Sequence, residues 1–179
     1  MQRRYIYHPL LNRYLTFNGN NSPVTLEKYL ADDSTRQQWD ITDAPAESTH
    51  QIRSVANPEQ CLDTKVEYIL PQRSYLYTMP CGSSPNDLRF QQWIFTNPIK
   101  ENDRYHFQVR NPNFKQSYWD TTSNTAVEPD VKRSIPGYRY LSYFREQGLP
   151  DPKPSTDVYF SSSDAYDKYQ RFTFPTISE

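Results

Sequence analysis

Glycine and long apolar runs are scarce in this sequence. Only four of its 179 residues are glycine, and no glycine-rich phosphate-binding loop, serine-hydrolase elbow or zinc-protease motif is present. No segment approaches the roughly 20 consecutive apolar residues that a membrane-spanning helix requires. We therefore expect a protein without enzymatic activity, without a cofactor and without membrane insertion by this chain.

An excess of charge of either sign is also missing. The 20 basic and 21 acidic residues leave a net charge of −1, so no overall field attracts nucleic acid. Hydrophobic residues make up 35% of the chain, and this share includes 15 tyrosines and three tryptophans, whose large side chains can be buried. The length of 179 residues predicts one folded domain, residues 1–179.

Cysteine is nearly absent. Cys61 and Cys81 stand twenty positions apart, and His8, His50 and His106 are isolated from them. Two thiols without histidine partners do not make a closed zinc site, so no metal site is expected. Taken alone, the pair fits either one disulfide or two free thiols.

Three similar units fill the chain, at about 5–41, 51–95 and 105–174. Each unit ends in a Gln-x-aromatic element followed by a further apolar residue. Each also contains a related short segment near its start. The three endings are Gln37-x-Trp39, Gln91-x-Trp93 and Gln170-x-Phe172, and the three starts are Tyr14-Leu15-Thr16, Cys61-Leu62-Asp63-Thr64 and Tyr118-Trp119-Asp120-Thr121. Repeats of this length indicate one structural unit used three times.

Within each unit the pattern is typical of strands. Short segments alternate with a two-residue period, they are rich in Tyr, Val, Ile and Phe, and Asn-Pro, Asn-Gly and Ser-Pro pairs separate them. The sequence therefore predicts an all-β domain. Three such units suggest a closed threefold arrangement, with Trp39, Trp93 and Phe172 buried together near its axis.

The order Cys-Leu-Asp-Thr, Pro-Cys, Gln-Gln-Trp in residues 61–93 resembles the repeat of the ricin-B-type (R-type) lectins. The resemblance implies a β-trefoil of three repeats, with a disulfide between Cys61 and Cys81 and with sugars as ligands. It also implies a secreted or extracellular protein, whose leader would be absent from this numbering.

The resemblance further implies which residues contact a sugar. An aspartate after the first cysteine position accepts hydrogen bonds from sugar hydroxyls, and it corresponds to Asp63 and Asp120, with Thr16 in the first repeat. These aspartates could instead brace turns. The position of the stacking aromatic holds Met79, and Tyr77 on the same segment could replace the missing ring or pack in the barrel. The asparagine before each Gln-x-aromatic element is replaced in all three repeats, by Arg36, Phe90 and Tyr169.

The third repeat contains a long insertion. It exceeds the second by about twenty-two residues, which map to roughly 128–155. Tyr138 and Tyr140 alternate there with Arg139, and tyrosine and arginine are enriched at binding hot spots. The insertion is either a loop packed against the barrel or a platform for a protein or glycan.

These observations predict a module that binds cell-surface glycans or glycoproteins. The lone trefoil with an aromatic insertion is similar to the binding subunits of cytolethal distending toxins and to the trefoil domains of binary toxins. That similarity implies the receptor-binding component of a toxin-like assembly, with another toxin subunit as a partner. The alternative is a trefoil protein-interaction module or protease inhibitor that binds through its loops.

Overall fold

The computed structural model describes residues 1–45, 48–67, 73–88 and 90–115, and shorter pieces of the third repeat at 118–120, 125–127, 138–142, 156–157, 159–161 and 171–177. Nearly all of the described elements are strands, which confirms the all-β prediction. The two described helices are each a few residues long, far too short to cross a membrane.

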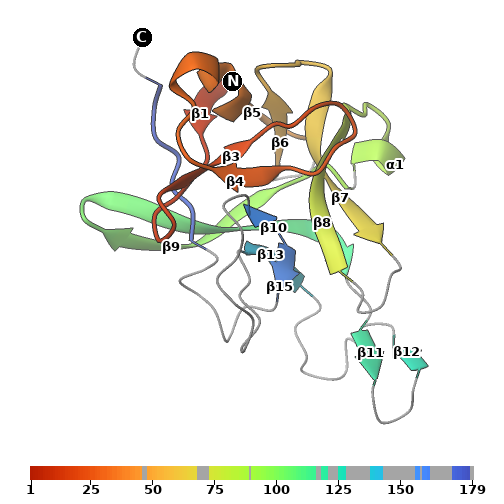
Figure 1. Ribbon diagram of the computed structural model, residues 1–179. Coiled ribbons are helices and arrows are strands. Elements are labelled where there is room, and N and C mark those ends of the chain that lie inside the picture. Colours follow the sequence, from red (N-terminus) through yellow and green to blue (C-terminus); the bar gives the residue numbers. More distant parts are fainter. Residues whose placement is uncertain are drawn as a thin grey trace.

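The elements follow the repeats (Figure 1). The first contains β1 (Gln2–Tyr5), β2 (Tyr7–His8), β3 (Arg13–Thr16), β4 (Thr25–Glu27), a 3-10 helix η1 (Ala31–Gln37) and β5 (Gln38–Asp43). The second contains β6 (His50–Ser54), β7 (Gln60–Glu67), β8 (Arg73–Pro80), α1 (Pro85–Leu88) and β9 (Ile94–Glu101). The third contains β10 (Arg104–Lys115), β11 (Tyr118–Asp120), β12 (Thr125–Val127), β13 (Tyr138–Ser142), β14 (Thr156–Asp157) and β15 (Tyr159–Ser161).

Strand pairing within and between repeats closes a barrel. β1 pairs with β5, β5 with β6, and β9 with β10, all antiparallel. Isolated bridges complete the ring: His50 with Trp93, Phe107 with Phe172 and Tyr7 with Thr173. The C-terminal segment 171–177 therefore lies between β10 and the start of the chain, and both termini appear at the top of Figure 1.

The aromatic residues of the Gln-x-aromatic elements form the centre of the core. Trp39, Trp93 and Phe172 are each 0% exposed, which confirms their predicted burial. The indole Nε1 of Trp39 donates to the carbonyl of Leu15 at 3.0 Å, and that of Trp93 donates to the carbonyl of Leu62 at 3.1 Å. Each tryptophan thus satisfies its buried donor on the corresponding strand of its own repeat.

Part of the insertion in the third repeat is a strand, where the sequence pattern indicated a loop. Tyr138–Ser142 forms β13, which pairs with β10 on one side and with β15 on the other. β15 in turn meets β8 through Tyr159 and Tyr75. The pairing partners of β13 are distant in sequence, so local patterning did not indicate them. The remaining residues of 128–155 lie outside the described part of the chain.

Candidate functional site

Gln91 organises a polar centre in the second repeat. Its Nε2 donates to Asp63 Oδ2 at 2.9 Å and to the Pro80 carbonyl at 2.9 Å. Its Oε1 accepts from the Gly82 amide at 2.9 Å and from Gln51 Nε2 at 3.3 Å. A buried amide with all these partners is held in one orientation, and it holds the Asp63 carboxylate with it.

The first repeat contains the same arrangement with a different acceptor. Gln37 Nε2 donates to the Thr16 hydroxyl at 3.0 Å and to the Lys28 carbonyl at 2.8 Å, while its Oε1 accepts from the Leu30 amide at 2.9 Å. Thr16 and Asp63 therefore occupy equivalent positions, as the alignment of the repeats predicts. The same position holds a carboxylate in the second repeat and a small hydroxyl in the first.

The disulfide between Cys61 and Cys81 is present and lies beside this centre. Cys61 is two residues before Asp63 on β7, and Cys81 lies between the Pro80 carbonyl and the Gly82 amide that Gln91 contacts. The disulfide therefore links the two segments that position Asp63 and Gln91. This pairing confirms the one that the resemblance implied.

Asp63 is a half-buried acid whose pKa is raised to about 6. Burial is the main cause because it disfavours the charged form, while hydrogen bonds from the Gln91 side chain and the Thr64 backbone lower the pKa and only partly offset burial. At neutral pH the group is a carboxylate with two oxygens, one of which accepts from Gln91 Nε2. It can accept further hydrogen bonds from hydroxyl groups.

Comparison with known proteins gives a result for structure but not for sequence. No protein-family model and no curated protein sequence matches the chain. A mosquitocidal holotoxin matches with a TM-score of 0.63 and 15% identity over 99% of this chain, which spans 17% of that chain. The cytolethal distending toxin from Actinobacillus actinomycetemcomitans matches with a TM-score of 0.61, 11% identity and coverage of 99% and 94%.

Lectins of the same architecture are also similar. The C-terminal domain of an earthworm lectin, solved as a mutant in complex with 6'-sialyllactose, has a TM-score of 0.55 and 14% identity, with 99% of this chain and 100% of that chain covered. The BEL β-trefoil has a TM-score of 0.55 and 12% identity, with coverage of 98% and 93%. The chain is a β-trefoil. Its structural neighbours are ricin-B-type lectins and toxin subunits, at low sequence identity.

In the second repeat, which is the second lobe of the trefoil, the residues predicted to contact a sugar lie on one face of the β7–β8 hairpin. The register pairs Asp63 with Tyr77 and Cys61 with Met79, so Tyr77 and Met79 share the face of Asp63. Tyr77 is only 7% exposed, however, whereas Met79 is half-buried. An isolated bridge pairs Pro23 of the first lobe with Tyr77, so the first lobe contacts the edge of β8.

Phe90 lies beside this centre, although it was not among the residues predicted to contact a sugar. It immediately precedes Gln91, and its carbonyl accepts from the Thr64 amide at 3.3 Å. Its side chain is half-buried. The resemblance marks its position as one that usually holds asparagine, so the replacement by an aromatic ring was the available signal.

In the third lobe the predicted residues lie on the short strands β11 and β13. Asp120 is the last residue of β11, opposite Thr125 of β12, whereas Asp63 lies opposite a tyrosine of the long strand β8. Tyr138 and Tyr140 lie on β13 at register positions opposite Lys115 and Arg110. The side chains of all three predicted residues, and Gln170, are outside the described part of the trefoil. Among the residues that are described, no group of three or more His, Cys, Asp or Glu could hold a metal ion.

Proposed function

We propose that this β-trefoil is a secreted carbohydrate-binding module whose second lobe binds the sugar. The observation that carries the proposal is the fixed position of the Asp63 carboxylate. Gln91 holds it by a hydrogen bond, and the neighbouring disulfide links the two segments on which Asp63 and Gln91 depend. The lectins among its structural neighbours support a glycan as the ligand.

The chemistry of the second lobe suits a sugar ring. Two adjacent hydroxyl groups need a rigid acceptor with two oxygens, and Asp63 supplies them without reorganisation because Gln91 fixes its orientation. Met79, on the same face of the hairpin as Asp63, and Phe90, next to Gln91 in the chain, are the half-buried apolar side chains that we expect to pack against the ring. The first lobe has no carboxylate at the equivalent Thr16, so we expect it not to bind.

Three candidate residues belong to the third repeat. We propose that Asp120 forms a second sugar contact and that Tyr138 and Tyr140 form part of a surface for a partner. Similarity to a mosquitocidal holotoxin and to cytolethal distending toxins supports a place in a multi-component toxin, in which this chain would bind the receptor.

A glycan array with the full chain tests the proposal. The wild-type protein should bind a defined class of glycans, and Asp63→Ala should abolish that binding. Thr16→Ala is the matched control, because it removes the equivalent acceptor of Gln37 in the first lobe; it should bind as the wild type does. Asp120→Ala measures the contribution of the third lobe.

Unchanged binding by both aspartate variants would refute the site assignment, and the absence of binding to any glycan would refute the function. The toxin component is tested separately by size-exclusion chromatography with candidate partner chains. Tyr138→Ala combined with Tyr140→Ala should prevent a stoichiometric complex, and an intact complex would show that these tyrosines are not the contact.

A further inference from the structure

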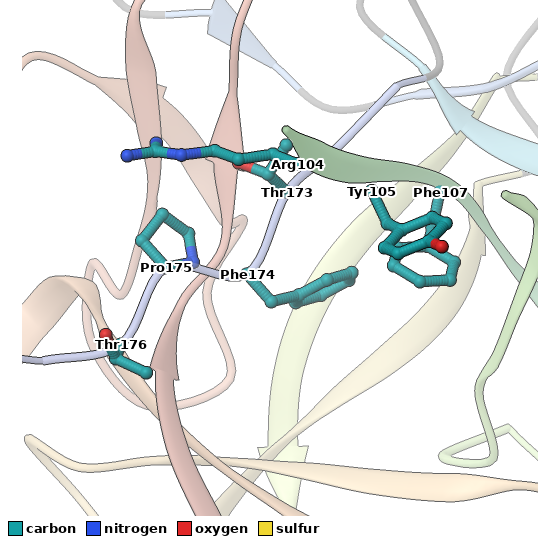
Figure 2. Close-up of a pocket in the computed structure, with 7 residues that line it drawn as sticks. All are labelled: Arg104, Tyr105, Phe107, Thr173, Phe174, Pro175 and Thr176. Carbon is teal, nitrogen blue, oxygen red and sulfur yellow. The ribbon is translucent and has the colours of Figure 1, made fainter. Parts of the chain in front are cut away.

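The C-terminal segment 171–177 and the start of β10 form only the beginning of a strand pair. Phe107 and Phe172 exchange two backbone hydrogen bonds, of 2.8 and 2.9 Å. Two residues further along, Tyr105 would face Phe174 in the same register, but no backbone hydrogen bond joins these two residues in the described part of the chain. A cavity of about 500 Å³ lies there instead (Figure 2). The cavity is therefore the place where two adjacent strands separate.

The C-terminal segment separates from β10 because it pairs with the first strands of the chain. Thr173 and Tyr7 exchange two backbone hydrogen bonds of 2.9 Å, and the Pro175 carbonyl accepts from the Tyr5 amide at 3.1 Å. Successive residues of a strand direct their N–H and C=O groups toward opposite edges. Because Thr173 and Pro175 use the edge that faces Tyr5 and Tyr7, the backbone groups of Phe174 point toward the cavity.

The backbone of Tyr105 points into the cavity from the other side. Arg104 lies opposite Glu101 across a two-residue turn, and the next pair is Tyr105 with Lys100. In such a hairpin the residues that flank the turn exchange hydrogen bonds, and the next pair does not. The N–H and C=O groups of Tyr105 therefore point away from β9, toward the same side as those of Phe107.

The cavity thus has unpaired main-chain groups on two sides, and its aromatic side chains lie on one face. The ring centroids of Tyr105 and Phe107 are 6.4 Å apart, and those of Phe107 and Phe174 are 5.8 Å apart. Figure 2 shows the Phe174 ring pointing toward the other two, whereas the Arg104 side chain extends in the opposite direction. Tyr105 is 56% exposed, so this aromatic face is open to solvent.

Arg104 gives the opposite face a positive charge. Its side chain is exposed and makes no hydrogen bond or ion pair within the described part of the chain. The acidic residues of the same hairpin lie near other cations, since Glu101 Oε2 is 3.8 Å from His106 Nδ1 and Asp103 Oδ1 is 3.9 Å from Lys100 Nζ. The guanidinium is therefore available for a carboxylate of a ligand.

An extended polypeptide strand matches all of these groups. It carries N–H and C=O groups along both edges, and its side chains alternate between two faces. Laid in the cavity, such a strand could pair with Tyr105 on one edge and with Phe174 on the other. Its apolar side chains would contact the rings, and its acidic side chains would lie on the side of Arg104. We propose that this cavity binds an extended segment of a partner protein in which apolar and acidic residues alternate.

Amide hydrogen exchange of the full chain, followed by NMR, tests whether the strand pair is open. The amides of Phe107 and Phe172 should be protected, because both donate to the opposite strand. Those of Tyr105 and Phe174 should exchange at least about tenfold faster. Equal exchange rates at all four amides would overturn the proposal, because the cavity would then offer no unpaired main-chain groups.

Selection from a displayed library of random peptides tests the ligand class. Peptides that bind the wild type should alternate apolar and acidic residues, and N-methylation of their central amides should weaken binding at least about tenfold, since it removes main-chain donors. Tyr105→Pro should abolish binding because it removes the donor in the cavity, whereas Tyr105→Val keeps that donor and should retain part of the affinity. Lys100→Pro is the matched control and should bind as the wild type does, because the N–H of Lys100 points to the far edge of the hairpin.

Three results would each overturn the proposal: no peptide selected by the wild type, equal binding by Tyr105→Pro, or undiminished binding of the N-methylated peptides. Dimerisation of the wild type that Tyr105→Pro prevents would also overturn it, because a second copy of this chain would then occupy the cavity. Asp63→Ala should bind the selected peptides as the wild type does. The peptide experiment can therefore fail or succeed independently of the glycan array that tests the proposed function.

Discussion

Replacing Asp63 with asparagine should make the protein more stable and abolish its sugar binding. The pKa of Asp63 is raised from 3.8 to about 6, mainly by burial, so the folded state binds a proton more tightly than the unfolded chain does. Protonation therefore favours folding, and the charged form opposes it. The stabilisation from the neutral form is fully present below pH 3.8 and is lost as the pH rises through about 6.

The size of the effect follows from the shift. A shift of about two pKa units corresponds to about 3 kcal/mol, and solvent screening of a partly exposed carboxylate reduces this to about 2 kcal/mol. The asparagine side chain of the variant would be neutral at every pH and could still accept from Gln91 through its carbonyl oxygen. At pH 7.5 the variant should thus gain about 2 kcal/mol in the free energy of unfolding, or a rise of about 6 °C in Tm.

The assay is urea denaturation of both proteins at pH 7.5 and at pH 4. The gain should be present at pH 7.5 and should nearly vanish at pH 4, because Asp63 is then largely protonated in the folded state. Other titrating groups affect both proteins equally and cancel in the difference. An Asp63→Asn variant that is less stable at pH 7.5, or a gain that is the same at both pH values, would refute the reasoning.

Three further changes test the centre around Asp63. Gln91→Leu removes a buried amide with several partners, so the free energy of unfolding should fall by about 2–4 kcal/mol and glycan binding should be lost. Chemical denaturation measures the loss of stability, and wild-type stability would contradict the hydrogen-bond network. Reducing the Cys61–Cys81 disulfide opens a loop with a sequence separation of 20. The free energy of unfolding should fall by about 3 kcal/mol, which a lower Tm in the presence of reductant would show. An unchanged Tm would show that other contacts constrain the loop. In Gly82→Ala the new Cβ would lie 2.2 Å from Asp87 Cβ, so α1 must shift. The free energy of unfolding should fall by about 1–3 kcal/mol, which a lower midpoint of chemical denaturation would show. An unchanged midpoint would contradict the close packing.

The sequence predicted the features that repeat. Trp39 and Trp93 are buried as expected, and each donates to the carbonyl of the aligned leucine in its own repeat. The match between Thr16 and Asp63 holds at the level of individual hydrogen bonds, since Gln37 and Gln91 bind equivalent atoms. Repetition made these positions predictable because the same local contacts satisfy the same buried groups in each lobe.

Contacts between lobes were not predictable in the same way. Strand alternation places Leu76 and Tyr77 on opposite faces of β8, yet both are buried, and a segment around Pro23 of the first lobe pairs with the edge of β8 at the same place. The cavity lined by Tyr105 and Phe174 likewise joins residues nearly seventy positions apart. Neither arrangement has a period or a motif that would reveal it.

The most direct test of the central claim is the affinity for the best-bound glycan of the array, measured by calorimetry for the wild type at pH 7.5 and at pH 5. If the Asp63 carboxylate accepts hydrogen bonds from the sugar, Kd should rise about tenfold at pH 5, because the group is then mostly protonated. Thr16→Ala should show the same pH dependence as the wild type. An affinity that does not change between these pH values would contradict the account, because the sugar would then be bound without the carboxylate.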